Sequence, residues 1–249
     1  VALELARDGL GESPDKPLEN VIDGAAVADS LHRIERETGN LTDLIDRLLV
    51  ISRLESGVQK PDFAEVDLAA MIRAVVADAN FEAKSSGRRV TLTSCEEFTT
   101  LGTAPLLRSA IENVVRNALR HTRENGGVEV SLVMQDPKTA QDFWTPEFPG
   151  DGCYVSELLD GARDRTGEVE QWGIVTVRDE GAGVPSTELS EIFRPFYRAG
   201  NGRTRQSGGA GLGLTITARS MELHGGQYRL CNLEPSGLEV QLRFPGARI

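Results

Sequence analysis

The first part of the chain carries apolar residues at alternating spacings of four and three, with charged residues between them. This heptad pattern predicts a long helix that packs against a second helix. We expect the helix to run to about Glu55 and to end at Gly57, a residue type that commonly terminates helices. Residues 1–8 are helical in composition and precede a loop, which indicates a helical hairpin with a truncated first arm. The heptad seam comprises Val27, Leu31, Ile34, Thr38, Leu41, Ile45 and Leu48.

After Gln59 the pattern becomes mixed. Apolar residues recur at helical spacing over residues 68–79 and again after Pro105, a good first residue for a helix. Because helices and strands do not alternate regularly, we expect a layered α+β fold and not a doubly wound sheet. The buried helix faces are expected to comprise Leu68, Met71, Ile72, Val75, Val76 and Ala79, then Leu107, Ala110, Ile111, Val114 and Ala118. The other expected elements are strands at 89–93, 128–134, 174–179, 227–232 and 238–244, a short acidic helix at 186–192 and a helix at 211–223.

Composition narrows the classes of function. The chain has 249 residues and a formal net charge of -11, which argues against a nucleic-acid binder because phosphate backbones attract basic surfaces. No secretory signal is visible, and no apolar run reaches the roughly 20 residues that a membrane-spanning helix needs. Cys95, Cys153 and Cys231 lack zinc-site spacing, and we expect free cytosolic thiols, not a disulfide framework. Because the chain starts at Val1 inside a helical pattern, we expect a fragment of a longer protein.

The helix after Pro105 contains the string NVVRNALRHT, residues 113–122. Asn113 and Asn117 are four residues apart and therefore share one helix face, with Arg120 and His121 about a turn further along. An amide oxygen can ligate Mg²⁺, and a nearby cation can meet the phosphates that the metal leaves exposed. The alternative for this string alone is an ordinary polar helix face.

Two glycine-containing segments follow. In DEGAGVP, residues 179–185, Asp179 ends a predicted strand and can accept a hydrogen bond from an exocyclic amine, while Gly181 and Gly183 allow the backbone to approach a flat ring. The alternative is a simple turn, since Asp and Gly dominate turns. In SGGAGLGLTI, residues 207–216, four glycines precede a patterned helix, an arrangement suited to phosphate binding; the alternative is a flexible linker. Those glycines are Gly208, Gly209, Gly211 and Gly213.

Together these strings resemble the ATP-binding domains of bacterial sensor histidine kinases, within the Bergerat-fold ATPases. NVVRNALRHT is similar to the N box of that family and DEGAGVP to its G1 box. IFRPFYR, residues 192–198, is similar to its F box, and SGGAGLGL to its G2 box. LIDRLLVISRLESG, residues 44–57, is similar to the end of the dimerisation helix. The resemblance implies a two-layer α/β sandwich, with ATP between the N-box helix and a mobile lid.

The resemblance also implies a role for individual residues. Asn117 corresponds to the Mg²⁺ ligand and Asp179 to the aspartate that reads adenine. Phe193 and Phe196 correspond to phenylalanines that anchor the lid, for which core packing is an equally good explanation. The other residues expected to contact ATP are Asn113, Arg120, His121, Gly181, Gly183, Arg198, Arg205, Gly209, Gly211, Leu212 and Gly213, with Arg203 a further lid arginine.

Two departures from the family pattern matter. No string of the H-box kind occurs, and none of His32, His121 and His224 suits the role of phosphoacceptor. We therefore expect a partial dimerisation hairpin, residues 1–57, that lacks the H box, and an ATP-binding domain, residues 62–249. The second departure is a long segment at about 136–171 that has Trp144 within it and Trp172 just after it. It is expected to be an elaborated hairpin, an interaction surface or a disordered loop.

The expected function is transfer of the γ-phosphoryl group of ATP to a histidine of the dimerisation domain, with Mg²⁺ as cofactor. This fragment is expected to bind ATP but not to phosphorylate itself in cis. The family implies a response regulator as partner, self-association through the hairpin, and a cytoplasmic region of an inner-membrane protein that is attached only through upstream segments.

Two alternatives stay open at this point. A hydrolytic Bergerat-fold ATPase needs a glutamate four residues before the metal-binding asparagine, but Asn113 stands there, and the adjacent Glu112 points about 100° away on an ideal helix. The other alternative is a nucleotide-binding interaction module without transfer activity.

Overall fold

The computed structural model describes residues 29–35, 38–39, 41, 44–45, 48–49, 51–52, 62–136, 144, 152–157, 169–199 and 210–247. The chain divides into two compact units, Val1–Asp43 and Leu44–Ile249. Every described position between Asp29 and Ser52 is helical, which confirms the predicted helix at those positions. The seam residues Leu31 and Ile34 are 57% and 61% exposed. The helix predicted at residues 1–8 and the helix end at Gly57 lie outside the described residues.

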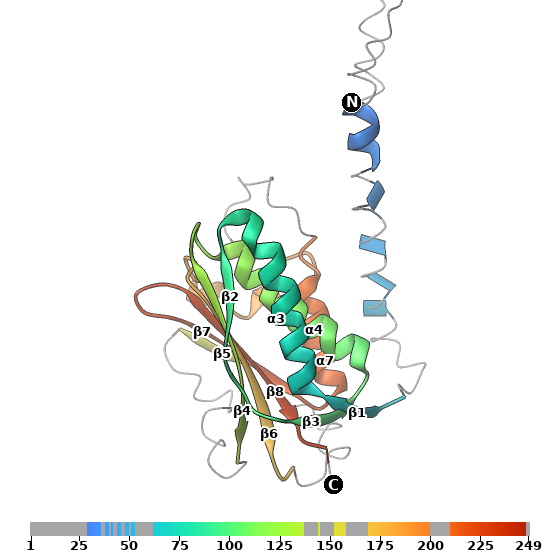
Figure 1. Cartoon of the computed structure of the whole chain (residues 1–249), viewed down its shortest axis with the longest axis vertical. Coiled ribbons are helices and arrows are strands. Elements are labelled where there is room, and N and C mark those ends of the chain that lie inside the picture. Colours follow the sequence, from blue (N-terminus) through green and yellow to red (C-terminus); the bar gives the residue numbers. More distant parts are fainter. Residues whose placement is uncertain are drawn as a thin grey trace, which may run out of the picture. The chain divides into compact units, whose positions relative to one another are not determined.

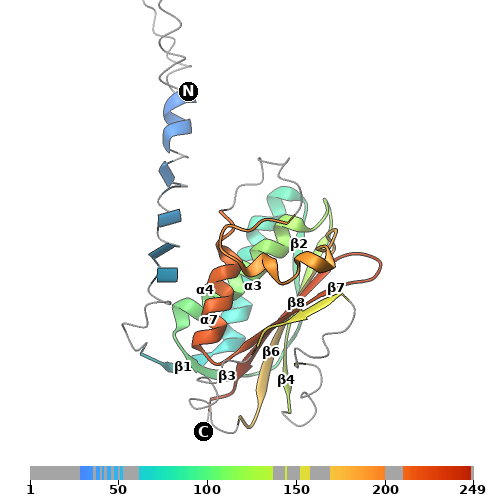
Figure 2. The same cartoon turned by 180° about the vertical axis from the view of Figure 1, so that it is seen from behind.

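Three α-helices lie on one face of a sheet in both views of the molecule (Figures 1 and 2). Helix α3, Leu68–Ala83, begins at Asp67, whose Oδ1 accepts a hydrogen bond from the N–H of Ala70 at 2.8 Å. Helix α4, Ala104–His121, has its proline in the first turn, where no backbone donor is lost from the helix ladder. Helix α7 spans Gly213–Leu223.

The main sheet has six strands in the order β2-β4-β6-β8-β7-β5. Among the described strands, β2 and β4 are the one parallel pair in this sheet, and the other neighbours pair antiparallel. A separate pair, β1 with β3, is antiparallel. The mixed sheet with helices on one face confirms the expected α+β sandwich. The strands are β1 (Ala64–Asp67), β2 (Arg89–Cys95), β3 (Thr99–Gly102), β4 (Gly127–Gln135), β5 (Cys153–Val155), β6 (Trp172–Asp179), β7 (Gln227–Asn232) and β8 (Leu238–Pro245).

The five strands expected from the sequence all form, and the strands that were not expected are the short β1, β3 and β5. Three or four residues are too few to show an alternating pattern, so their pairing depends on neighbours distant in the sequence. The acidic helix expected at 186–192 is instead two 3₁₀ turns, η3 (Ser186–Glu188) and η4 (Glu191–Phe193). A third turn, η1 (Lys84–Ser86), follows α3.

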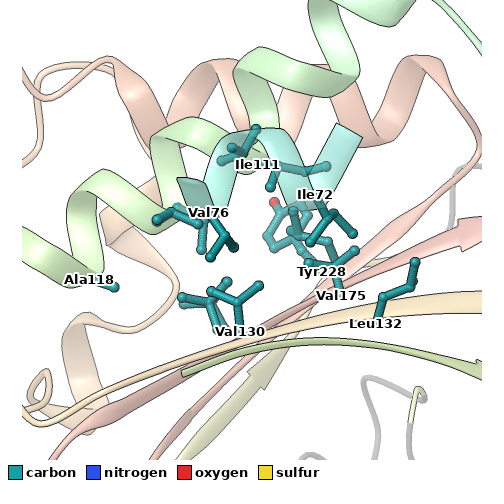
Figure 3. Packing of buried hydrophobic residues seen from close by; sticks show 14 of the residues in the cluster. Ile72, Val76, Ile111, Ala118, Val130, Leu132, Val175 and Tyr228 are labelled. Carbon is teal, nitrogen blue, oxygen red and sulfur yellow. The ribbon is translucent and has the colours of Figure 1, made fainter. Parts of the chain in front are cut away.

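The main core lies between the helices and the sheet (Figure 3). Ile72 of α3 and Ile111 of α4 are fully buried, and they pack above Leu132 of β4 and Val175 of β6, which are also fully buried. All of the helix positions predicted to be buried are buried except Met71, which is partly exposed and packs at the edge of this core.

A second, smaller core occupies the opposite face of the sheet. Trp144 packs there with Val155 of β5 and Ile174 of β6. The guanidinium of Arg243 stacks 4.0 Å from the ring centroid of Trp172 and 5.4 Å from that of Trp144, and burial lowers its pKa to about 10. Parts of the long 136–171 segment therefore cover the sheet, and β5 extends its edge.

The expectation of three free thiols was wrong. Cys153 of β5 and Cys231 of β7 form a disulfide, and only Cys95 is free. The two residues are direct cross-strand partners with their Cα atoms 4.1 Å apart. They are 78 residues apart in the sequence, so no local spacing could reveal the pair. Among the described residues, no helix is both long and apolar enough to cross a membrane.

Candidate functional site

Helix α4 brings Asn113 of the N box to the beginning of α7. A Cβ placed on Gly213, the first residue of α7, would lie 3.0 Å from Asn113 Oδ1. The buried hydroxyl of Thr217 fastens the two helices, since it donates to the carbonyl of Ala110 at 3.1 Å. The N box and the second glycine segment, about a hundred residues apart in the sequence, therefore form adjacent walls of one site.

Asn113 and Asn117 are both half-buried on α4. The Asn113 amide nitrogen donates weakly to Ser109 Oγ at 3.5 Å. Within the described part of the chain, no hydrogen bond engages the Asn117 side chain. An amide oxygen in this position suits a metal ion whose remaining ligands come from phosphates and water. No cluster of three His, Cys, Asp or Glu side chains in the described ranges offers an alternative metal site.

Asp179 ends β6 at the opposite end of the site. Its side chain is buried, with 6% exposed, and burial raises the pKa of its carboxyl group. Two backbone donors oppose that rise, because Oδ1 accepts from the N–H of Gly181 at 2.7 Å and from the N–H of Leu238 at 3.3 Å. These two hydrogen bonds fix the orientation of the carboxylate. A fixed orientation is what a group needs in order to accept a hydrogen bond from one particular donor on a ligand.

The glycines beside Asp179 stand where a side chain would not fit. A Cβ on Gly181 would lie 2.7 Å from both Asp179 Oδ1 and the carbonyl oxygen of His121, the last residue of α4. Gly183 has φ +73°, in the left-handed region that favours glycine. The loop after β6 therefore rests directly against the end of the N-box helix.

Thr122 also contributes to this contact, although no role in the site was expected of it. Its hydroxyl donates to the carbonyl of Gly127 at 3.2 Å and accepts from the N–H of Glu180 at 3.0 Å. Glu180 also pairs with Arg123 at 3.0 Å. The available sequence signal was the threonine that ends the N-box string, but its partner Glu180 lies 58 residues away along the chain.

The F box reaches the same region. Phe193 is buried and its ring lies 4.2 Å from that of Tyr228, so this residue packs in the core. Phe196 is 57% exposed and adopts φ +64°, with its N–H donating to the carbonyl of Gly211 at 3.0 Å. Gly211 itself has φ +71°, and a Cβ there would lie 2.9 Å from the Phe196 carbonyl carbon. A backbone hydrogen bond therefore joins the F box to the second glycine segment.

Basic residues gather beside the end of α4. Burial lowers the pKa of the His121 imidazole, and the charges of Arg120 and then Arg198 lower it further. Arg198 follows the F box, so this end of the site combines cations from two segments. Such a group suits the charge of a polyphosphate. Leu212 is fully buried and packs with Ile216 and Ile51, so its side chain serves packing. Arg203, Arg205, Gly208 and Gly209 lie outside the described residues.

Glu112 faces away from this site. Its carboxylate pairs with Arg108 at 2.7 Å and with Arg116 at 3.9 Å, and it borders a groove between α3 and α4 together with Asp78 and Glu82. The carboxylate that a hydrolytic ATPase would use to activate water is therefore absent from the Asn113 side of α4.

Residues 102–248 match the family model described as the histidine kinase-, DNA gyrase B-, and HSP90-like ATPase. The chain is 31% identical over 219 residues to the sensor histidine kinase CpxA of Escherichia coli strain K12, covering 86% of this chain and 39% of that protein. It is 27% identical over 246 residues to the alginate biosynthesis sensor protein KinB of Pseudomonas aeruginosa, covering 98% of this chain and 34% of that protein. The chain thus spans between about one third and two fifths of the length of these relatives.

Solved structures share the fold. The histidine kinase AdeS of Acinetobacter baumannii has a TM-score of 0.60 at 15% identity, with 99% of this chain and 92% of that chain covered. Full-length ShkA in complex with AMPPNP also has a TM-score of 0.60, at 24% identity, with 89% of this chain and 40% of that chain covered. With the family match over residues 102–248, these comparisons show that the chain belongs to the histidine kinase-, DNA gyrase B- and HSP90-like ATPase family and contains the ATP-binding region of a sensor histidine kinase.

Proposed function

We propose that this chain binds Mg²⁺·ATP and supplies the γ-phosphoryl group to a histidine on a dimerisation helix. The observation that carries the proposal is the convergence of Asp179, Asn113 with Asn117, and the glycine start of α7 around one site. Glu112, the carboxylate next to Asn113 in the sequence, pairs with Arg108 instead of facing the site, which favours transfer over hydrolysis. The similarity to relatives named as sensor histidine kinases also supports phosphoryl transfer.

In the proposed mechanism, Asp179 accepts a hydrogen bond from the exocyclic amine of adenine, in the space that Gly181 and Gly183 leave open. Asn117 would hold Mg²⁺ through its amide oxygen, and Asn113 would line the same position. Bound Mg²⁺ supplies neutralisation of charge on the phosphates. Arg120 and Arg198 would add positive charge at that end beside His121, whose lowered pKa favours the neutral imidazole. Arg205, Gly209, Gly211, Leu212 and Gly213 would lie on the lid side.

The proposed division is a dimerisation segment, residues 1–57, and a catalytic domain, residues 62–249. We infer that the acceptor histidine comes from outside this sequence, so that transfer occurs to a supplied acceptor. A response regulator would then receive the phosphoryl group, and self-association would use the heptad seam. Attachment to the inner membrane would come from segments beyond this sequence, with the present region in the cytoplasm.

The test combines calorimetry with phosphoryl transfer in trans. We expect saturable ATP binding that requires Mg²⁺, weakened at least about 10-fold in Asn117→Ala and Asp179→Asn through loss of a metal ligand or of a charged hydrogen bond. Labelled ATP should also label a separately made dimerisation fragment that contains an H box. Arg116→Ala is the matched control, because Arg116 neighbours Asn117 but pairs with Glu82 on α3. ATP binding without any transfer would instead favour an interaction module, and no binding by the folded chain would refute the proposed site.

A further inference from the structure

The edge of the sheet links the 136–171 segment to the adenine end of the site. Strand β5 lies within that segment and pairs with β7, and the Cys153–Cys231 disulfide joins the two strands covalently. The backbone N–H of Asn232, the residue after Cys231, donates to the carbonyl of Gly152 at 3.0 Å. The covalent bond thus lies directly beside a backbone contact between the same two strands.

Asn232 also binds the loop that follows Asp179. Its Oδ1 accepts from the N–H of Val184 at 2.8 Å, and its Nδ2 donates to the carbonyl of Val184 at 2.7 Å. A Cβ on Gly183 would lie 2.6 Å from Asn232 Oδ1. One side chain therefore holds both backbone groups of Val184, while the start of β8 holds Asp179 through the N–H of Leu238.

The disulfide encloses most of the nucleotide site. The chain between Cys153 and Cys231 contains Asp179, both glycines beside it, the F box and the start of α7. Cross-linking two residues restricts the conformations that the intervening chain can reach when it opens. The bond therefore bears on the mobility of the segments that surround the proposed ATP position.

The two sulfurs differ in environment. Cys231 is buried, whereas Cys153 is half-buried, and the Arg229 guanidinium lies 3.6 Å from its sulfur. A cation beside a sulfur favours the thiolate, which is the reactive form in thiol–disulfide exchange. The accessible sulfur is therefore the one whose reduced form is stabilised by charge.

We propose that Asn232 is a positioning residue for the adenine end of the site and that the Cys153–Cys231 bond makes this positioning sensitive to thiol redox state. The proposal rests on the proposed ATP site. In the reduction step, a thiolate of an external dithiol attacks Cys153 Sγ, and Cys231 leaves as a thiolate that takes up a proton. The second thiol of the reagent then attacks the mixed disulfide and releases Cys153. The protein gains two electrons and two protons, and the dithiol becomes a disulfide.

The test measures Mg²⁺·ATP affinity of the whole chain by calorimetry, oxidised and after treatment with dithiothreitol. We expect affinity to fall about 3- to 10-fold on reduction, because the loop that Asn232 holds is less restrained. A Cys153→Ser/Cys231→Ser variant should have the ATP affinity of the reduced protein, and dithiothreitol should not change that affinity. Cys95→Ser is the control, since Cys95 lies on β2 at the far edge of the sheet and should leave the redox response intact.

The preference for ATP over another nucleotide shows whether Asn232 positions the adenine end of the site or only stabilises the fold. Inosine triphosphate carries an oxo group where ATP has the amine that Asp179 is proposed to read. Reduction and Asn232→Ala should both lower the preference for ATP over inosine triphosphate at least about 3-fold, whereas a merely structural role would weaken both nucleotides equally. Equal ATP affinity and preference in the two redox forms, or alkylation of Cys153 and Cys231 as well as Cys95 in the air-oxidised protein, would overturn the proposal. Absence of ATP binding in the oxidised protein would instead refute the underlying site.

Discussion

At the scale of single residues, Asp179 combines the clearest chemical role with an energetic cost. Burial raises the pKa of its carboxyl group above the ordinary value, so the folded state binds the proton more tightly than the unfolded state does. The ionised carboxylate is therefore less favourable in the folded protein than in water. Such a cost is common where a site is organised for a ligand and not for stability.

Asp179→Asn should weaken ATP binding about 10- to 100-fold, the loss of one hydrogen bond to a charged group. The amide oxygen can still accept from Gly181 and Leu238, so the loop geometry should remain. The melting temperature at pH 7 should be equal to or higher than that of the unsubstituted protein, because the variant removes a buried charge. Calorimetry measures the change in ATP affinity, and thermal unfolding measures the change in melting temperature.

The pH dependence of that difference follows from the direction of the pKa shift. Above the raised folded-state pKa the cost of the charge is fully present, and it disappears as the pH falls through that pKa to below the ordinary value of 3.8. The advantage of Asp179→Asn in melting temperature should therefore shrink between pH 7 and acid pH. A variant that melts clearly lower than the parent at pH 7 would contradict this account.

At the scale of elements, the decisive contact is between α4 and the beginning of α7. These helices lie side by side on the sheet in Figures 1 and 2, and Thr217 bonds to Ala110 across the contact. Gly213 allows the close approach, because any Cβ there would press on Asn113 at 3.0 Å. The start of α7 can therefore lie this close to Asn113 because residue 213 has no side chain.

Gly213→Ala should separate the effects on binding and on folding. The new methyl group displaces Asn113 or the start of α7, and we expect ATP affinity to fall about 3- to 10-fold. The melting temperature should change little, because alanine favours a helix over glycine by up to about 1 kcal/mol and offsets the crowding. Gly39→Ala is the matched control, since Gly39 is helical with no atom within 4 Å of the added Cβ, and it should bind ATP normally. Unchanged affinity in Gly213→Ala would show that the contact does not shape the site.

At the scale of the whole molecule, the proposed site joins segments from most of unit Leu44–Ile249. Its parts come from the end of α4, the end of β6, the F box and the start of α7, all supported by one core. A ligand that contacts all of them binds the folded state and not the unfolded chain, so it must raise the stability of that unit as a whole.

Mg²⁺·ATP at 100 times its dissociation constant should therefore stabilise the chain by about 2.7 kcal/mol. For a domain of this size that corresponds to an increase in melting temperature of roughly 5–10 °C. The increase should depend on Mg²⁺ and should be largely lost in Asn117→Ala, as measured by differential scanning calorimetry. An equal increase with ATP and a chelator would argue against a metal-bridged nucleotide.

Local signals in the sequence were enough for the long elements and for the site motifs. Periodicity marked α3 and α4 because each buries a whole face, and it marked β4 and β6 because each is long enough to alternate or to remain apolar throughout. The motif strings were readable because Asn117, Asp179 and the glycines sit at fixed spacings within single turns or helices.

Other features depend on residues that meet only after folding. The pairing of β5 with β7, the Cys153–Cys231 bond and the hold of Asn232 on Val184 join positions about 50 to 80 residues apart, which carry no mutual signal in one sequence. The packing of Gly213 on Asn113 and the burial that raises the pKa of Asp179 arise in the same way. Short-range spacing can specify a helix, a turn or a motif, but the distance between two segments and the burial of a charge are properties of the packed chain, because they depend on every element between them.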